Sequence, residues 1–195
     1  MRSLWLLRHG QTDWNLEGRW QGQTPIAPGL NAAGRSQAIE AGHMLRRESI
    51  PCIYSSDLPR ARQTAEWIAG LLGARLVLEP RLREIHLGEW EGMLGGEIAS
   101  RYPLELAERE ADPMRSCAPG GESVKQVADR VWPAVDEIIS RHPPGQSILI
   151  VSHGIALGTI LCRAEQVPLE KVYEHIPENG LPSHVYWKVC STAAG

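Results

Sequence analysis

Short apolar segments alternate with segments of helical periodicity along this chain, and little else in the sequence narrows the choice of fold so strongly. The patterns predict strands at 3–8, 51–56, 75–78 and 147–152. Helices are predicted between and after them, at 31–47, 59–72, 123–141 and 154–163. Strands that alternate with helices form a parallel sheet covered on both faces. We therefore expect an α/β fold, a three-layer α/β/α sandwich whose mostly parallel sheet has one antiparallel edge strand at 184–190.

Local signals predict where several of these elements begin and end. Asn31 is a typical N-cap residue, and Ser123 with Gln126 has the form of a capping box. Gly73 is a helix stop, and Pro133 predicts a kink within its helix. Gly and Pro residues recur in 12–34, so we expect that segment to be a loop.

Composition excludes several classes of protein. A chain of 195 residues is long enough for one domain with its own core. The longest apolar run near either end is 4–7, far shorter than the roughly 20 residues of a membrane span, so we expect no membrane association. Twenty basic residues against 23 acidic ones give a net charge of -3, which offers no excess for nucleic acid. The four cysteines form no C-x-x-C pair, and with no export signal visible we expect free thiols in the cytoplasm.

Polar side chains follow the predicted strands, at the edge where α/β sheets place their chemistry. Arg8 and His9 follow the first strand, and Arg60 lies shortly after the second. Glu84 follows the third strand and His153 the fourth. Because the carboxyl ends of parallel strands share one edge of the sheet, we expect these side chains to lie together.

This set of residue types fits phosphoryl transfer. Two guanidinium groups can neutralise a phosphate and bind it bidentately. A neutral imidazole is a competent nucleophile toward phosphorus, and a carboxylic acid can protonate a leaving alkoxide. His153 also precedes a predicted helix, whose first backbone N–H groups favour an anion. The residues therefore suggest a phosphohistidine intermediate.

Two other classes of function remain open from the residues alone. His9, Glu84, His153 and Asp57 could be the metal ligands of a hydrolase, although neighbouring arginines disfavour a cation site. The chain could also be a binding module for a phosphorylated ligand, although binding alone needs no acid. A chelator separates the first case from a metal-independent enzyme.

Five segments of the sequence resemble the motifs of a known family. The segment 7–15, LRHGQTDWN, closely resembles the signature of the histidine phosphatase superfamily, the phosphoglycerate-mutase-like proteins. Further blocks are similar to the family's later motifs and follow in the family's order: SSDLPRARQTA at 55–65, LREI at 82–85 with GEWEG at 88–92, GGES at 120–123 and VSHG at 151–154. The pattern is closest to the α-ribazole-phosphate and broad-specificity phosphatases.

The resemblance implies a role for each matching residue. His9 is the implied nucleophile, and Glu84 the implied proton donor to the leaving group. Arg8, Arg60 and His153 are implied to hold the phosphoryl oxygens. The implied substrate-binding residues are completed by Asn15, Gln21, Gly22 and Gly154. Thr12 matches a hydroxyl residue near the nucleophile, although it could be a helix cap.

The sequence favours a phosphatase over a cofactor-dependent phosphoglycerate mutase. The mutases of the family carry a long insertion with a Lys and an adjacent Arg-Arg pair before the second His, and this chain has neither the length nor the pair. The mutase Tyr-Gly after the catalytic Glu is replaced here by Glu91-Gly92. We expect a single domain, 1–195, in which 88–121 caps the pocket. The cap's mixture of residues suggests a partly apolar leaving group, with little beyond Arg101, Arg109 and Arg115 to hold a second anion.

The expected reaction is hydrolysis of a small phosphomonoester, with no cofactor and no metal. The mutase reaction, and a dedicated α-ribazole-phosphate or phosphoserine phosphatase, are the alternatives. The sequence identifies neither the physiological ester nor the oligomeric state.

Overall fold

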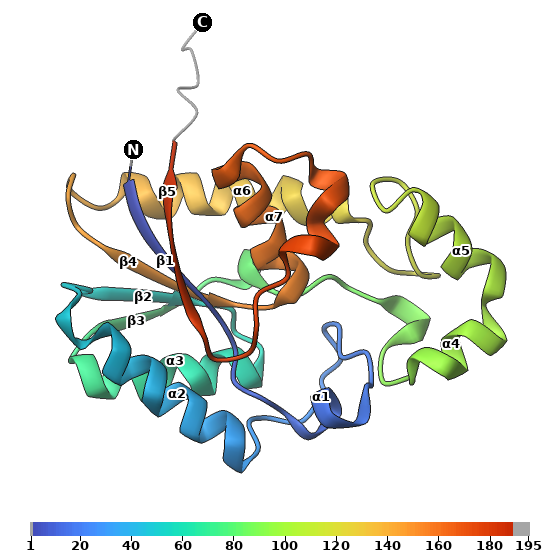
Figure 1. The fold of residues 1–195 in the computed structure, drawn as a ribbon, viewed down its shortest axis with the longest axis horizontal. Helices are drawn as coiled ribbons and strands as arrows, with labels where there is room; N and C mark the ends of the chain where they lie inside the picture. The colour runs from blue at the N-terminus through green and yellow to red at the C-terminus, as the bar shows by residue number, and fades with distance from the viewer. Residues whose placement is uncertain (1, 189–195) are drawn as a thin grey trace, which may run out of the picture.

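The computed structural model describes residues 2–188 and contains one five-stranded sheet in the order β3-β2-β4-β1-β5 (Figure 1). The pairs β1–β4, β4–β2 and β2–β3 are parallel, and β5 pairs antiparallel with β1 at one edge. The strands are β1 (Arg2–Arg8), β2 (Cys52–Ser55), β3 (Arg75–Leu78), β4 (Ile148–Ser152) and β5 (Pro182–Trp187). The sheet confirms the expected mixture of parallel strands and one antiparallel edge strand.

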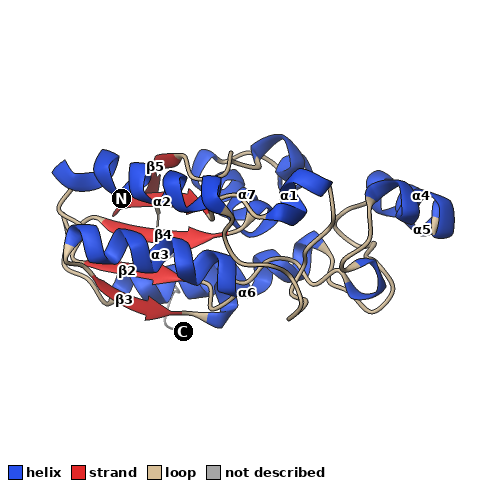
Figure 2. Ribbon diagram, turned by 90° about the horizontal axis from the view of Figure 1, so that it is seen from below, coloured by secondary structure: helices blue, strands red, loops and turns tan. Residues whose placement is uncertain are grey.

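Helices cover both faces of the sheet, which confirms the three-layer arrangement (Figures 1 and 2). On one face Leu149 and Val151 of β4 pack against α2 (Ala32–Met44) and α3 (Pro59–Leu72). On the other face Ile148 and Ile150 pack against α6 (Val124–Ser140) and α7 (Gly154–Glu165). Both sets are buried because a central parallel strand has no solvent face.

The expected helix ends are confirmed by their capping contacts. The side chain of Asn31 accepts a hydrogen bond from the N–H of Gly34 at the start of α2. Ser123 and Gln126 form the expected capping box of α6. Gly73 ends α3 with φ +64°, a conformation that glycine adopts without strain. Pro133 lies inside α6, which runs on to Ser140, so the kink stays a prediction.

Two expectations about local structure were wrong in part. The segment 12–34 is not all loop, because α1 (Asp13–Glu17) forms within it. Thr12 and Asn15 make a capping box that stabilises this short helix, and Gly18 ends it with φ +73°. The edge strand runs from Pro182 to Trp187 rather than over 184–190, and residues 189–190 lie outside the described residues.

The segment 88–121 extends beyond the carboxyl ends of the parallel strands (Figure 2). It contains a short 3-10 turn (Gly88–Trp90), α4 (Gly95–Arg101) and α5 (Pro103–Ala111). Trp90 and Ile98 are fully buried in the core on the α6 and α7 side, and they anchor the segment. Among residues 2–188, no helix combines the length and the apolar character that a membrane crossing requires.

Candidate active site

The carboxyl ends of the central strands bring the expected residues together. His9 follows β1, and its N–H donates to the carbonyl of Ser152 at the end of β4. His153 follows β4, Arg60 lies in the first turn of α3, and Glu84 lies between β3 and α4. A cavity of 320 Å³ opens at this edge, and Arg8, His9, Arg60 and Glu84 all line it.

His9 is held as a neutral imidazole with one nitrogen free to react. Its Nδ1 lies 2.8 Å from the carbonyl oxygen of Gly10. Because a carbonyl only accepts, Nδ1 carries the proton and Nε2 keeps its lone pair. Burial lowers the pKa of His9 well below its ordinary value of 6.5, and the charges of Arg60 and Arg8 lower it further. The arrangement leaves Nε2 unprotonated at neutral pH.

Two arginines supply positive charge beside this nitrogen. Arg60 is buried, donates from Nε to Nε2 of His9 at 3.1 Å, and donates from Nη2 to the carbonyl of Gly22. Burial lowers the pKa of Arg60 to about 10, so the guanidinium stays charged at neutral pH. Arg8 donates from Nη1 to the carbonyl of Pro177, and its buried Nε has no partner among the described residues. The cavity therefore offers the charge that a phosphoryl group needs.

His153 lies beside His9, with ring centroids 5.1 Å apart. It is fully buried, and its Nε2 lies 2.8 Å from the hydroxyl of Ser56. Burial lowers the pKa of His153 well below 6.5, and the charge of Arg60 lowers it further. Within residues 2–188, its buried Nδ1 has no hydrogen-bond partner. A neutral ring that accepts from Ser56 at Nε2 carries its free N–H at Nδ1.

Glu84 occupies the N-terminus of α7, which corrects the expectation that a substrate anion binds there. Its carboxylate accepts hydrogen bonds from the N–H groups of Ile155 and Ala156, at 3.1 and 3.3 Å. These backbone N–H groups, which have no partner within the helix, fix the position of the carboxyl group. Gly154 is buried and does not line the cavity, and a Cβ there would lie 3.5 Å from Glu84 Oε2. The helix therefore orients the candidate acid rather than the phosphate.

The loop that carries Glu84 is fixed by a residue that the sequence analysis did not single out. Arg130 of α6 donates to the backbone carbonyls of Arg81, Arg83 and Glu84. Its guanidinium also pairs with Glu122, whose carboxylate accepts the N–H of His86. Arg130 lies within a long helix and belongs to no recognised motif, so these contacts could not be predicted from the sequence.

The three expected substrate-binding residues of the first loop line the cavity: Asn15, Gln21 and Gly22. The side-chain oxygen of Asn15 accepts from the N–H and hydroxyl of Thr12, which leaves its amide donors free. Gly22 has φ +51°, and a Cβ there would lie 2.3 Å from a carboxylate oxygen of Glu91. Thr12 is fully buried and acts as the cap of α1.

The family model of the histidine phosphatase superfamily (branch 1) matches residues 4–190. The chain belongs to this superfamily. The match includes every residue that lines the cavity, and it makes the chain an enzyme of the histidine phosphatase type.

Relatives of known name include phosphatases and a mutase. The chain is 33% identical to phosphoserine phosphatase 1 of Hydrogenobacter thermophilus over 186 residues, 95% of this chain and 87% of the relative. It is 39% identical to a probable phosphoglycerate mutase of Salmonella choleraesuis over 169 residues, 83% of this chain and 74% of the relative.

Solved structures of the superfamily share the whole fold. A mycobacterial glucosyl-3-phosphoglycerate phosphatase superposes with a TM-score of 0.85 at 32% identity, over 97% of each chain. The α-ribazole phosphatase of Shigella flexneri superposes with a TM-score of 0.84 at 27% identity, over 93% of this chain and 89% of the other. The fold extends across phosphatases whose named substrates differ.

Several polar residues of the motif blocks and the cap lie away from the reacting centre of this histidine phosphatase. Asp57 pairs with Arg83, so it is not free to bind a metal. The carboxylate of Glu89 accepts from the hydroxyl of Tyr102. His86 lies with its Nδ1 3.0 Å from the carbonyl of Gly120, and 43% of its side chain is exposed. Arg101 is exposed and is not among the residues that line the cavity.

Part of the cavity lining comes from residues that match none of the motifs. Trp20 and Arg19 follow α1, Arg109 comes from α5, and Tyr173 and Ile176 come from the 3-10 segment Leu169–His175 and the residue after it. Arg109 was one of three cap arginines in the sequence, and the structure brings it alone of the three to the cavity. These residues come from distant segments, so no local pattern could have grouped them.

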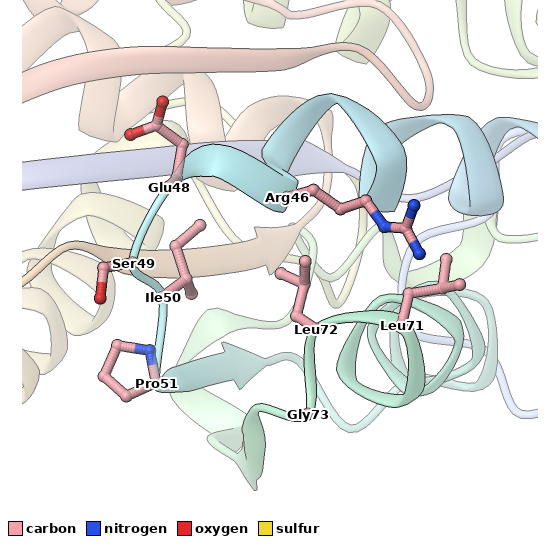
Figure 3. Close-up of a pocket in the computed structure, with 8 residues that line it drawn as sticks. All are labelled: Arg46, Glu48, Ser49, Ile50, Pro51, Leu71, Leu72 and Gly73. Atoms are coloured by element: carbon pink, nitrogen blue, oxygen red, sulfur yellow. The ribbon is translucent and has the colours of Figure 1, made fainter.

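A second hollow, of 450 Å³, lies at the opposite end of the sheet, where β2 and β3 begin (Figure 3). Its charged residues are Arg46 and Glu48, and the remaining lining is Ser49, Ile50, Pro51, Leu71, Leu72 and Gly73. In Figure 3 the carboxylate of Glu48 points away from Arg46. With no histidine and one exposed arginine, this hollow lacks the groups for phosphoryl transfer.

Proposed function

We propose that this protein is a phosphatase that hydrolyses a small phosphomonoester through a phosphohistidine on His9, without a metal. The observation that carries the proposal is the contact between His9 Nε2 and Arg60 Nε inside the cavity. This contact places the unprotonated nucleophile, His9 Nε2, next to a fixed positive charge, the Arg60 guanidinium. A phosphoryl group bound to Nε2 would lie beside that charge. A pure binding site has no use for a nucleophile of this kind.

In the first half of the reaction, His9 Nε2 attacks phosphorus. The N–P bond forms as the P–O bond to the leaving group breaks, and Glu84 gives its proton to the departing alkoxide. In the second half, the carboxylate of Glu84 removes a proton from water, which attacks phosphorus and releases His9 and inorganic phosphate. Each half returns Glu84 to the protonation state that the other half needs.

The remaining polar groups hold the transferring phosphoryl oxygens. Arg8 and Arg60 both line the cavity, and the ring of His153, whose Nδ1 has no partner among the described residues, lies beside His9. Fixed donors of this kind stabilise developing charge without reorganisation. Asn15, Gln21 and Gly22 complete the pocket in this proposal, whereas Gly154 opens α7 beside Glu84 without lining the cavity.

The two guanidinium groups take the place of a metal ion in this mechanism, and no cofactor is required. Within residues 2–188, no three His, Cys, Asp or Glu side chains are grouped so as to hold a metal. Asp57, the fourth ligand of the metal alternative, is paired with Arg83. We therefore expect full activity in excess EDTA, and loss on chelation with recovery on Mg²⁺ or Zn²⁺ would contradict the proposal.

The names of the relatives suggest which substrates to test. Relatives at similar identity act, by name, on phosphoserine, phosphoglycerate, glucosyl-3-phosphoglycerate or α-ribazole phosphate. A mutase is the second candidate because a relative at 39% identity is named as a probable one. A mutase converts 3-phosphoglycerate to its isomer with little released phosphate, so one assay of both products separates the two reactions.

We further propose one domain, 1–195, with 88–121 as the cap that closes over the substrate. Trp90 and Ile98 anchor the segment in the core, while Arg109 of α5 lines the cavity. A cytoplasmic enzyme fits the three described cysteines, Cys52, Cys117 and Cys162, which are all free thiols. The expected partner is a small phosphomonoester rather than nucleic acid or a membrane.

Trapping of the phosphoenzyme tests the mechanism directly. Rapid acid-free quenching of the enzyme with ³²P-labelled substrate should give an acid-labile, base-stable adduct on His9. His9→Ala should lose the adduct and several orders of magnitude of activity. His43→Ala, on the exposed face of α2, is the matched control and should keep both. Ordinary turnover by His9→Ala would refute the mechanism.

A further inference from the structure

Arg109 is a buried cation that no acidic side chain neutralises. Its residue is 5% exposed, although it lies on α5 in the segment that extends beyond the sheet. Within residues 2–188, it makes no ion pair and donates no side-chain hydrogen bond. Arg60, the other buried arginine among the described residues, has an acceptor in the carbonyl of Gly22. Arg109 therefore keeps its guanidinium donors unused.

Aromatic rings surround the guanidinium group of Arg109. Its Cζ lies 5.3 Å from the ring centroid of Trp20, 5.7 Å from that of Trp90 and 5.9 Å from that of Tyr173. Cation–π contacts of this kind hold the group in place and offset part of its desolvation. They satisfy none of its N–H donors, which point outward in the plane of the guanidinium group and need oxygen acceptors there.

Arg109 borders the space that a substrate would occupy. Arg109 lines the same cavity as His9, Arg8 and Arg60. It also lines an adjoining hollow of 330 Å³ with Trp20, Leu106, Glu110 and Tyr173. A phosphomonoester whose phosphoryl group lies against His9 has its leaving group in the rest of this cavity, where Arg19 and Arg109 are the remaining cationic residues. Arg19 is partly exposed, pairs with Glu17 and donates to the carbonyl of Gly92, whereas the donors of Arg109 are unused.

We propose that Arg109 is a specificity-determining residue that binds a carboxylate on the leaving group of the substrate. This inference rests on the proposed phosphatase function and names the class of ester that it prefers. A guanidinium pairs bidentately with a planar carboxylate, and the low dielectric of the aromatic wall strengthens the pair. A second phosphate is disfavoured because the carboxylate of Glu110 lines the adjoining hollow and repels two charges more than one.

The other cap arginines serve as internal comparisons. Arg101 and Arg115 are both exposed, and neither lines the cavity or the adjoining hollow. An exposed arginine on the cap adds only a screened, long-range attraction for an anionic substrate. Of the three cap arginines, Arg109 alone lines the cavity and can contact a carboxylate there.

Matched pairs of esters isolate the carboxylate. O-phosphoserine differs from O-phosphoethanolamine by the carboxylate alone, and so does 4-carboxyphenyl phosphate from phenyl phosphate. In the third pair, 3-phosphoglycerate has a carboxylate where glycerol 3-phosphate has a hydroxymethyl group. For at least one pair, the wild-type enzyme should have a kcat/KM for the carboxylate member about 10- to 150-fold above that of its partner, the range expected of a charged hydrogen bond. Arg109→Met, which keeps the length and apolar stem, should abolish this ratio. Arg109→Lys should keep part of it, and Arg115→Met should leave it at the wild-type value.

The ratio within one variant is insensitive to loss of folded enzyme, because inactive protein lowers both members of a pair equally. If Arg109→Met does not fold, the wild-type ratios and Arg109→Lys still decide the matter. A wild-type enzyme with no preference for a carboxylate in any pair, or an Arg109→Met variant with the wild-type ratio, overturns the inference. These outcomes are distinct from failure of the proposed function, in which p-nitrophenyl phosphate labels no histidine and releases no phosphate.

Discussion

Arg60 donates a hydrogen bond from Nε to Nε2 of His9 across 3.1 Å, and both side chains are buried at the carboxyl edge of the sheet. A protonated imidazole cannot accept this bond, so the contact selects the neutral, nucleophilic form of His9. The same guanidinium is then adjacent to the phosphoryl group when Nε2 attacks phosphorus. One arginine thus acts on both the nucleophile and the charge of the transition state.

Replacing Arg60 should therefore slow phosphorylation of His9 for every substrate. We expect Arg60→Met to lower the single-turnover rate by about 10²- to 10³-fold on alkyl and aryl phosphates alike, the usual loss for one charge-stabilising donor. Arg62→Met is the matched control, because Arg62 lies two residues further along α3, is exposed and pairs with Glu66. A loss confined to alkyl phosphates would show that Arg60 acts on the leaving group instead.

The same variant should change the acid limb of the pH profile. The charge of Arg60 lowers the pKa of His9, second only to burial, so its removal should raise that pKa toward 6.5. The pH at which phosphorylation becomes half-maximal should then be higher in Arg60→Met than in the wild-type enzyme. Titration of the substrate's own phosphate is common to both enzymes and cancels in this difference. An unchanged or lower midpoint would contradict the assignment of His9 as the titrating group.

The role of Glu84 should depend on the leaving group. An alkyl phosphate releases an alkoxide that needs a proton, whereas p-nitrophenolate leaves as a stable anion. We expect Glu84→Gln to slow phosphorylation by an alkyl phosphate about 10²- to 10⁴-fold, and to slow phosphorylation by p-nitrophenyl phosphate much less. Single-turnover measurement is essential, because hydrolysis of the phosphohistidine is common to all substrates.

Glu89→Gln is the control for this experiment, since Glu89 is bound to the Tyr102 hydroxyl. It should leave both phosphorylation rates at the wild-type value. If Glu84→Gln lowers both rates equally, the carboxylate is not the proton donor, and the backbone donors of α7 hold it for another purpose.

Ser56 should act through His153. Its hydroxyl lies 2.8 Å from His153 Nε2 and accepts from the N–H of Leu58, so it has one proton left to donate to the ring. Ser56→Ala removes the group that keeps the proton on Nδ1, and we expect kcat to fall about 10-fold or more, with Ser56→Thr retaining most of it. Measurement of the ¹⁵N shifts of His153 by NMR should show the change of tautomer. A lower kcat with an unchanged tautomer would mean that Ser56 only packs against the ring.

The strand ends could be predicted from the sequence because the signals are local. Arg8 ends the apolar strand β1 and His9 directly follows it, and the pairing of β1 with β4 then places both residues beside His153. Helix caps such as Asn31 and Ser123 are equally local, since each acts within three residues of itself. Recognition of the superfamily from five short motifs rests on the same residues.

Features that depend on distant segments could not be predicted in this way. Glu84 binds the N-terminus of α7, some 70 residues along the chain, and takes the donors that the sequence had suggested for phosphate. Arg130 fixes the Glu84 loop from the middle of a helix. The choice of Arg109 over Arg101 and Arg115 depends on the way that α5 turns toward Trp20 and Tyr173. Sequence periodicity predicts which helix carries such a residue, but the packing of distant segments determines which side chains it contacts.

The two buried histidines should make the protein less stable as the pH falls. Burial holds the pKa of His9 and of His153 well below 6.5 in the folded protein, whereas both rings titrate near 6.5 in the unfolded chain. Below pH 6.5 the unfolded state therefore binds more protons than the native state, so the free energy of unfolding rises with pH and falls on acidification. The slope is at most about 1.4 kcal/mol per pH unit for each histidine. Urea unfolding between pH 7.5 and 5.5 measures this loss, because carboxylates stay ionised over most of that range.

His9→Gln should remove its own share of the slope, while His43→Gln, on the exposed face of α2, serves as the control. A His9→Gln variant with the wild-type slope would show that His9 takes up its proton in the folded protein as readily as in the unfolded chain, and the neutral nucleophile would have to be abandoned.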